Sequence, residues 1–385
     1  MFRVPLRHWF RAQTYVGRRG AWSTRAVHVE EKSDQGQRPA LRLKVHDTNV
    51  YSSGQLKRTK WYEVNRDDNY GYKQWDSHTS PWRYWRHLGL LMHSSSLRRV
   101  LFPNMFAIGC ISAGVGYYNS VIAPATDSML LSFPTMPLTL TGVGLSLLLV
   151  FRTNQSNARF DSARGCWGTV INRSRVLLRL SSTYIAKRDE QTYERVVRLL
   201  KSFPKTLHFH LSEDGDFAVN NDNSTVVMKD DGLRLFLEQD GHSPGVVDEI
   251  MREGSRPLAV VEMISFEIAS INLDPRHECI FQDNLTELDI AVGQCERILK
   301  TPIPTSYTRH TSRFLTLYTM MIPFALHSQC GNVGTCFASL FIAFGLYSIE
   351  DIGVTIEQPF GVLPTWRYVE SVDKNCNSHL QRIVS

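Results

Sequence analysis

Two uncharged segments constrain the fold of this chain more than any other feature of its sequence. Residues 101–123 and 131–151 contain no Asp, Glu, Lys, Arg or His over 23 and 21 residues. A helix rises about 1.5 Å per residue, so either segment is long enough to cross a hydrocarbon core of ~30 Å. Only a short stretch separates them, which predicts two membrane helices joined as a hairpin. The first is rich in Gly, Ala and Ser, which let neighbouring membrane helices approach closely.

A third apolar window covers 314–349, where His327 is the only residue of those five types. These 36 residues are too many for one span and divide at SQCGNVG, 328–334, into two pieces of about 15 residues. Pieces this short imply tilt, or burial against the other helices. We therefore expect four membrane segments, at about 101–123, 131–151, 314–328 and 333–349.

Most of the remaining chain is polar, and a mean hydropathy of −0.22 places the larger part of the protein in water. The insert 152–313 has apolar residues at three- and four-residue steps, which predicts helices. The helical pattern of 176–211 is expected to be broken at Pro204, and the last insert helix to stop at Pro302. Basic residues beside the apolar windows put the insert and both chain ends on one side, the matrix, stroma or cytosol.

The N-terminus has six arginines and no acid before Glu30. Arg-rich, acid-free sequence is typical of an organelle transit peptide, to which we assign residues 1–29. We expect a multi-pass protein of the mitochondrial inner membrane or of a plastid or thylakoid membrane; a basic cytosolic arm that binds a membrane is the alternative. The polar residues 30–80 are expected to be extended or disordered. Trp82 and Trp85, set among arginines, suit a helix at the membrane interface, or one packed on a soluble domain.

Several function classes find no support in the sequence. The net charge of +6 is modest and comes without an RNP motif or zinc finger, so nucleic acid is not an expected partner. No GxSxG, P-loop or GxGxxG motif indicates an enzyme. The histidines at 208, 210 and 310 lack metal-ligand spacing, so neither a metal nor another cofactor is expected. Seven cysteines without a CxxC pair indicate reduced, packed thiols; whether Cys330 and Cys336 pair is left open.

Three motifs resemble the bestrophin family, in its bacterial and plant-type branch. FRTNQSNARFDSARGCWGTVINRSR resembles the signature that follows the family's second membrane helix, and it matches at Phe151, Arg152, Asn154, Arg159, Phe160, Ala163, Arg164, Trp167, Gly168 and Asn172. CERILKTPIPTSYTRHTSRFL matches a second motif at Cys295, Glu296, Arg297, Pro302, Pro304, Tyr307, His310 and Arg313. IEDIGVTIEQPFG, 349–361, matches a third. Their order and separations over about 80–361 argue against chance agreement.

The resemblance implies an all-α membrane protein with four membrane helices per subunit and a large extramembrane helical region, assembled as a pentamer. The implied function is an anion channel that passes chloride, and also nitrate or bicarbonate, passively through a central pore in a lipid bilayer. A non-conducting membrane scaffold or assembly protein with the same fold is the alternative. The chain then divides into a transit peptide (1–29), a polar segment (30–80), a channel domain (81–361, insert 152–313) and a C-terminal tail (362–385).

The resemblance also locates the pore constriction, or neck. In the family, three side chains four residues apart line it, and the first precedes a proline fifteen residues before the arginine of the FR motif. Pro137 has that spacing to Arg152, which implies that Pro137 starts the pore helix and that the neck residues are Met136, Leu140 and Gly144. Such positions share one helix face, and rings of Met and Leu form a constriction that gates by dewetting; ordinary helix packing is the alternative. Gly144 departs from the bulky residues common at this level, so a less tight neck is expected.

Four polar residues of the first motif are candidates for an anion vestibule or for structural bracing: Arg152, Asn154, Arg159 and Arg164. Arg152 and Arg159 are seven residues apart and so lie near one helix face, where they would raise the local anion concentration. The alternative is ion pairing with insert carboxylates such as Asp161 or Glu194.

Calcium gating is not expected. Animal members of the family carry a run of acids directly after the PFG motif, which forms an oxygen-rich calcium site. Here VLPTWRYVES follows, with no acid before Glu370. The remaining acids, Glu350, Asp351 and Glu357, are expected to make inter-subunit or helix-cap contacts.

Overall fold

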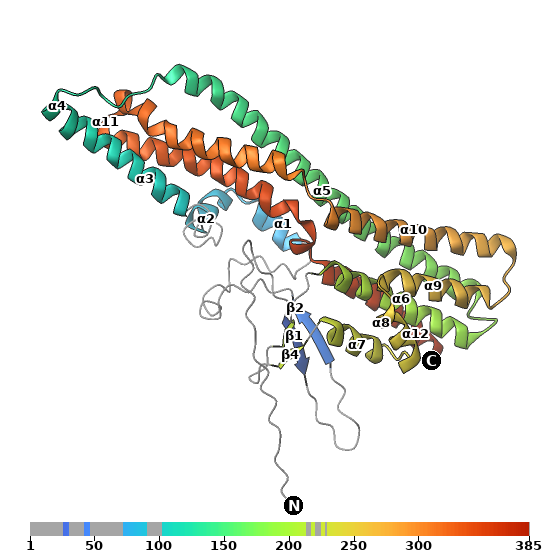
Figure 1. Cartoon of the computed structure of the whole chain (residues 1–385). Coiled ribbons are helices and arrows are strands. Elements are labelled where there is room, and N and C mark those ends of the chain that lie inside the picture. The colour runs from blue at the N-terminus through green and yellow to red at the C-terminus, as the bar shows by residue number, and fades with distance from the viewer. Residues whose placement is uncertain are drawn as a thin grey trace, which may run out of the picture.

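The computed structural model describes residues 26–30, 42–46, 72–90, 102–212, 217–219, 225–227 and 229–384. Apart from four short strands, the elements in these ranges are helices. They build an elongated molecule with an apolar part and a polar part, and a single long helix runs through both (Figure 1).

The apolar part contains the helices that the hydropathy pattern predicted. Its elements are α3 (Phe102–Tyr117), the π-helical turn η3 (Tyr118–Ile122), α4 (Ala123–Thr126), the first half of α5 (Thr135–Tyr184), and α11 (Thr305–Glu357). Among the described residues, three helical segments are long and apolar enough to cross a membrane: Phe102–Thr126, α5 and α11. Residues 127–134 join the first two as a hairpin. We call this the membrane part.

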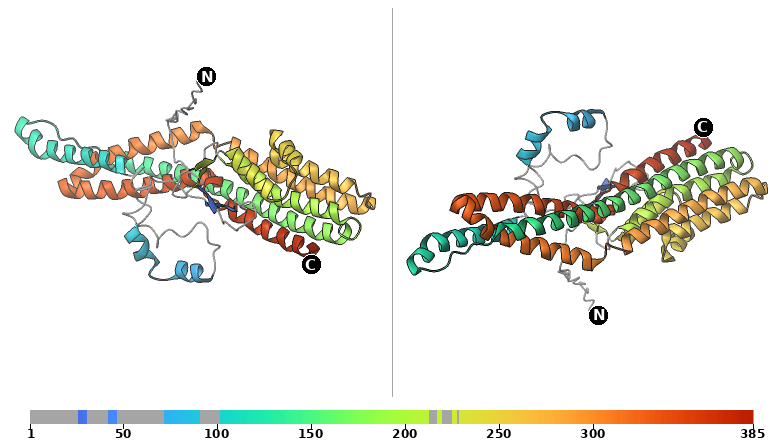
Figure 2. Two further views of the ribbon diagram at one scale, coloured as in Figure 1. Left: turned by 90° about the horizontal axis from the view of Figure 1, so that it is seen from below. Right: turned by 90° about the horizontal axis from the view of Figure 1, so that it is seen from above.

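α5 continues without interruption from the apolar segment into the arginine-rich one. Its 50 residues correspond to about 75 Å of helix, far more than a bilayer needs. Two further views show the same helix passing from the membrane part to the far end of the polar part (Figure 2). The change from apolar to arginine-rich sequence at Arg152 therefore occurs within one continuous helix, where it passes from the membrane part into the polar part.

α11 is a helical hairpin that folds back on itself (Figure 1). Gly331, at the turn, has φ 66° and ψ −173°, a conformation that favours glycine because it has no Cβ. Hydrogen bonds join the two arms from Thr319 Oγ1 to Tyr347 Oη at 3.2 Å and from Ser312 Oγ to Glu350 Oε1 at 2.9 Å. The turn lies within 328–334, as expected, but each arm is longer than 15 residues because the helix continues into its polar flanks.

The polar part packs the second half of α5 together with six further helices, and we call it the insert bundle. They are α6 (Glu190–Leu211), α7 (Lys229–Gln239), α8 (Pro244–Arg252), α9 (Arg256–Ala269), α10 (Pro275–Lys300) and α12 (Thr365–Val384). One apolar cluster forms its core, with Trp167, Phe203 and Phe281 fully buried. Removal of this surface from water is the main force that holds the bundle together.

The predicted break at Pro204 is wrong, because Pro204 lies inside a continuous α6. A proline within a helix removes one backbone hydrogen bond and crowds the preceding turn. Leu200, Phe203 and Leu207 surround it and are each 0% exposed, so burial of both adjoining turns offsets that cost.

The segment 362–385, assigned to a tail, contains α12 (Thr365–Val384), a packed helix of the insert bundle. Val369, Val372 and Cys376 lie in the core. Their spacing of three and four residues is that of one helix face. The helical signal was present in the sequence, but it lay beyond the last family-like motif.

The N-terminal elements are short, and two of them pair in a sheet with two strands that lie between α6 and α7. Strands β1 (Ala26–Glu30), β2 (Arg42–His46), β3 (Phe217–Val219) and β4 (Thr225–Val227) form a sheet in the order β2-β1-β3-β4. Helices α1 (Tyr72–Thr79) and α2 (Arg83–Leu90) precede the membrane part, with Trp82 and Trp85 exposed. Nearly all of the predicted transit peptide, and most of 30–80, lie outside the described residues.

Candidate functional site

One face of α5 in the membrane part is apolar and is left uncovered by the other helices that the structure describes. The exposed side chains, at steps of four and three residues, are Met136, Leu140, Val143, Leu147 and Val150, each at least 52% exposed. The opposite face is buried: Leu145 and Leu149 pack against the α11 hairpin and α3 in a small core. A regular apolar stripe that no other described element of the subunit covers fits contact with lipid, with other subunits or with a pore.

Two of the three predicted neck residues, Met136 and Leu140, belong to this stripe, and Gly144 lies beside it. Met136 is 73% and Leu140 69% exposed, and a Cβ built on Gly144 would meet no atom within 4 Å. α5 begins at Thr135, which places Pro137 in the first turn, where its missing N–H leaves no helical hydrogen bond unmade. The structure thus brings Met136, Leu140 and Gly144 together on one exposed face near the start of the helix.

Asn154 extends the same face beyond the apolar border. It follows Met136 by 18 residues, which is about five helical turns, and it is exposed. Further along, the exposed Asn157 donates a hydrogen bond to Asp161 at 3.4 Å. The uncovered face of α5 therefore changes from apolar to polar at about the position of Arg152.

Arg152 itself points away from that face. It lies sixteen residues after Met136, or about 160° around an ideal helix, and its side chain is 1% exposed. The guanidinium donates a hydrogen bond from Nη1 to Glu350 Oε1, and Nη2 lies 3.7 Å from Glu357 Oε2. Ser312 Oγ donates to the same Glu350 oxygen at 2.9 Å. Arg152 therefore ties α5 to the second arm of the α11 hairpin at the border of the membrane part, and Glu350 links that arm in turn to Ser312 on the first arm.

Arg159 binds the ends of two helices. Its guanidinium donates to the carbonyl oxygens of Ile298 at 2.6 Å, Thr301 at 2.6 Å and Glu357 at 3.1 Å. These carbonyls end α10 and α11 and have few helical partners, and a positive charge there also opposes the negative end of each helix dipole.

Arg164 lies 4.7 Å from the ring centroid of Tyr368, a cation–π contact between α5 and α12. Of the two roles considered for the arginines, the contacts of Arg152, Arg159 and Arg164 are those of structural bracing.

The partners of Arg152 differ from those expected. Arg152 contacts Glu350 and Glu357, and not the insert carboxylates Asp161 or Glu194. Glu350 and Glu357 were expected in inter-subunit or helix-cap contacts, but both contact Arg152 within the subunit. Glu350 lies 198 residues from Arg152, so no local pattern relates them. The only available signal was that both residues fall in family-like motifs.

Two further contacts fix α5 against the first arm of α11. Tyr307 Oη donates to the Leu148 carbonyl at 2.9 Å. At Gly142 the arm approaches so closely that an added Cβ would lie 2.6 Å from Tyr318 Oη. These contacts hold the covered side of α5 and leave the Met136 side free.

The far end of the membrane part is held by a polar network. The Asn119 side chain accepts from the Leu131 N–H at 2.7 Å and donates to the Leu131 carbonyl at 3.1 Å. It also contacts His327 Nδ1 at 3.1 Å, and His327 Nε2 contacts Asn332 at 2.8 Å. The loop before α5 is thereby fastened to the turn of the α11 hairpin, which sets the position of Met136.

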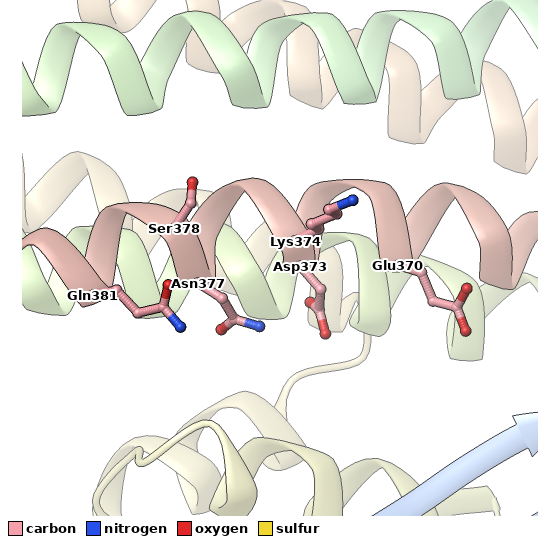
Figure 3. A pocket seen from close by; sticks show the side chains of 6 residues that line it. All are labelled: Glu370, Asp373, Lys374, Asn377, Ser378 and Gln381. Carbon is pink, nitrogen blue, oxygen red and sulfur yellow. The ribbon is translucent and has the colours of Figure 1, made fainter.

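Other polar groups lie away from this face. The described residues hold no group of three or more His, Cys, Asp and Glu placed to bind a metal. Cys330 and Cys336 are both free. A polar hollow of about 410 Å³ is lined by side chains of α12 alone, among them Glu370, Asp373 and Lys374 (Figure 3). Burial raises the pKa of Asp373, and the ammonium of Lys205, 3.2 Å away, opposes that rise.

Known proteins resemble this chain over most of its length. A family model described as bacterial and fungal bestrophin protein matches residues 74–378. Two Arabidopsis thaliana proteins are named chloroplastic voltage-dependent chloride channels 2 and 1. Channel 2 is 32% identical to this chain over 303 residues, which cover 76% of this chain and 68% of the relative. Channel 1 is 30% identical over 312 residues, which cover 80% of this chain and 71% of the relative. A crystal structure of a bacterial bestrophin homologue from Klebsiella pneumoniae has the same fold, with a TM-score of 0.63 at 23% identity over 72% of this chain and 98% of that one.

Proposed function

Because the chain belongs to the bestrophin family, we propose that it is an anion channel in which five copies surround a central pore. The observation that carries the proposal is the uncovered face of α5, on which Met136 and Leu140 are exposed and Gly144 has open space beside it. Five such faces turned toward one axis would cover one another's apolar stripe and enclose a passage. The relatives named as chloride channels support the same function.

The neck of this pore consists of stacked rings from Met136, Leu140 and Gly144. Apolar rings bind no ion tightly, and they interrupt the water column when the passage is narrow. Large, weakly hydrated anions lose less hydration free energy there than small cations do, so chloride, nitrate and bicarbonate are the proposed permeant ions. The Gly144 ring has no side chains, so the constriction is set by the Met136 and Leu140 rings.

Below the neck, the polar continuation of the α5 face forms the wall of a wider vestibule. Asn154 is the first polar side chain there, and its amide can donate hydrogen bonds to a passing anion. Arg152 and Arg159 stand behind this wall and hold its shape through Glu350 and the helix-end carbonyls. They fix the helix that carries the permeation face without touching the ion.

We propose that opening needs no calcium. The sequence after Gly361 lacks the acidic run of the animal proteins. Of the acids that precede the PFG motif, Glu350 and Glu357 both have their carboxylates beside the Arg152 guanidinium.

The proposed location is a plastid membrane. Both Arabidopsis relatives are named chloroplastic, and the arginine-rich, acid-free start of this chain has the composition of a transit peptide. Expression of residues 1–40 fused to a fluorescent protein distinguishes plastid from mitochondrial import.

Planar-bilayer recording of the purified full-length protein tests the function. With unequal KCl on the two sides, the current is expected to reverse near the chloride equilibrium potential. It should stay there when K⁺ is replaced by a large organic cation or calcium is chelated. Light scattering of the same sample should give five subunit masses. Silent but well-folded pentamers would contradict the channel and favour the scaffold.

A further inference from the structure

Two cysteines of the insert bundle meet between α5 and α10. Cys166 is 3% and Cys295 0% exposed, and both belong to the same apolar core. Cys166 Sγ donates to Oε1 of Gln294, the residue before Cys295, at 3.2 Å. The Cys295 thiol also interacts with the Cys166 sulfur as a hydrogen-bond partner. Both cysteines are free, so the two interacting thiols are reduced and come from segments 129 residues apart.

The two thiols are chemically unequal. The hydrogen bond from Cys295 lowers the pKa of the Cys166 thiol, and the charge of Arg297 lowers it further. The interaction with Cys166, followed by burial, raises the pKa of Cys295. Because the thiolate is the nucleophile in disulfide exchange, Cys166 is suited to attack the oxidant first. Cys295 is then the second thiol, which resolves the mixed disulfide.

The Cys166 sulfur contacts the side chain of Gln294 at 3.2 Å. Gln294 is an exposed residue, whereas Cys166 itself is almost fully buried. Displacement of the Gln294 side chain would expose the sulfur that it contacts. Cys376 differs: it is buried, and burial together with Asp373 raises its pKa.

We propose that Cys166 and Cys295 are an oxidation site, at which a disulfide oxidant forms a reversible disulfide between α5 and α10. The Cys166 thiolate attacks one sulfur of the oxidant's disulfide and releases the other as a thiolate, which leaves a mixed disulfide. Cys295 then loses its proton, and its sulfur attacks the Cys166 sulfur and releases the second oxidant thiol. Two protein thiols are oxidised and one oxidant disulfide is reduced, so no further reactant is needed.

The bond would tighten a seam that already supports the border of the membrane part. A disulfide holds its sulfurs at about 2.05 Å, closer than any non-bonded contact. Arg159 lies seven residues before Cys166. It donates hydrogen bonds to the carbonyl oxygens of Ile298 and Thr301, which follow Cys295 in the chain. The site does not depend on whether the protein conducts ions.

Peptide mapping of the full-length wild-type protein tests the proposal. After incubation with glutathione disulfide, free thiols are alkylated in acid and the chain is cut with trypsin without reduction. The expected product is a linked pair of peptides, 165–173 and 277–297, in at least half of the molecules, and dithiothreitol should abolish it. Because peptide 277–297 also contains Cys279, the Cys279→Ser variant is the matched control and should give the same yield of linked peptides. Gln294→Ala should speed their formation several-fold.

Two results would overturn the proposal. One is full alkylation of Cys166 and Cys295 after exposure to the oxidant, with glutathione found only on exposed cysteines such as Cys110. The other is loss of the linked peptides in Cys279→Ser, which would assign the bond to Cys279.

Discussion

Replacing Arg152 by alanine should destabilise the protein by about 3–5 kcal/mol, because it leaves the Glu350 carboxylate buried without its partner. Glu350 is 9% exposed and its remaining hydrogen bond comes from the neutral Ser312 hydroxyl. The measurement is the denaturation midpoint of the detergent-purified protein, followed by tryptophan fluorescence. The double variant Arg152→Met with Glu350→Leu, which removes both charges, should recover much of the loss.

Arg367→Ala is the matched control for this prediction. Arg367 also pairs with a glutamate, Glu370 at 2.9 Å, but the two side chains are 34% and 48% exposed, and solvent-exposed pairs contribute about 0–1 kcal/mol. An equal effect of Arg152→Ala and Arg367→Ala would contradict the bracing role. A fall in conductance at unchanged stability would instead place Arg152 in the ion pathway.

Leu140→Glu should abolish anion conduction, because it adds five carboxylates at one level of an apolar constriction. Two unit charges 4 Å apart repel by about 4 kcal/mol at an effective dielectric constant of 20. Since about 1.4 kcal/mol is a tenfold change, we expect chloride conductance to fall by at least about 100-fold. The measurement is macroscopic current across bilayers that contain equal amounts of folded protein.

Leu140→Gln separates charge from shape in this experiment. Glutamine has nearly the size of glutamate and is neutral, so this variant should assemble and continue to pass chloride. Equal chloride conductance in Leu140→Glu and Leu140→Gln would remove Leu140 from the pathway, since the added charge would then have no effect on the ion.

The sequence predicted the elements whose signal is continuous along the chain. The uncharged segments gave the α3–α5 hairpin, and the break at 328–334 contains the turn at Gly331. The family prediction from three motifs is confirmed by the match over residues 74–378. The positions of Met136, Leu140 and Gly144 on one face followed from helical periodicity, and their part in a pore stays a proposal.

Long-range contacts escaped prediction for a physical reason. Arg152 and Glu350 are 198 residues apart, and whether an arginine after an apolar segment faces water or a buried acid depends on how the helices pack. Pro204 shows the same limit: its local preference to end a helix was outweighed by burial of the turns around it. α12 was missed because its amphipathic pattern lay outside the motifs that defined the channel domain.

The most direct test of the account asks whether the uncovered face of α5 borders the ion pathway. In a background with Cys110, Cys279 and Cys330 changed to serine, Leu140→Cys and Phe341→Cys are each exposed to an anionic methanethiosulfonate reagent during recording. Leu140 and Phe341 are similarly exposed in the subunit, at 69% and 78%, but they lie on α5 and α11 respectively. If this face borders the pathway, Leu140→Cys should be blocked rapidly and irreversibly and Phe341→Cys should be unchanged. Block of Phe341→Cys alone would contradict a pathway along α5. So would a Leu140→Cys channel that still conducts after exposure, whether mass spectrometry shows its cysteine to be modified or unreactive.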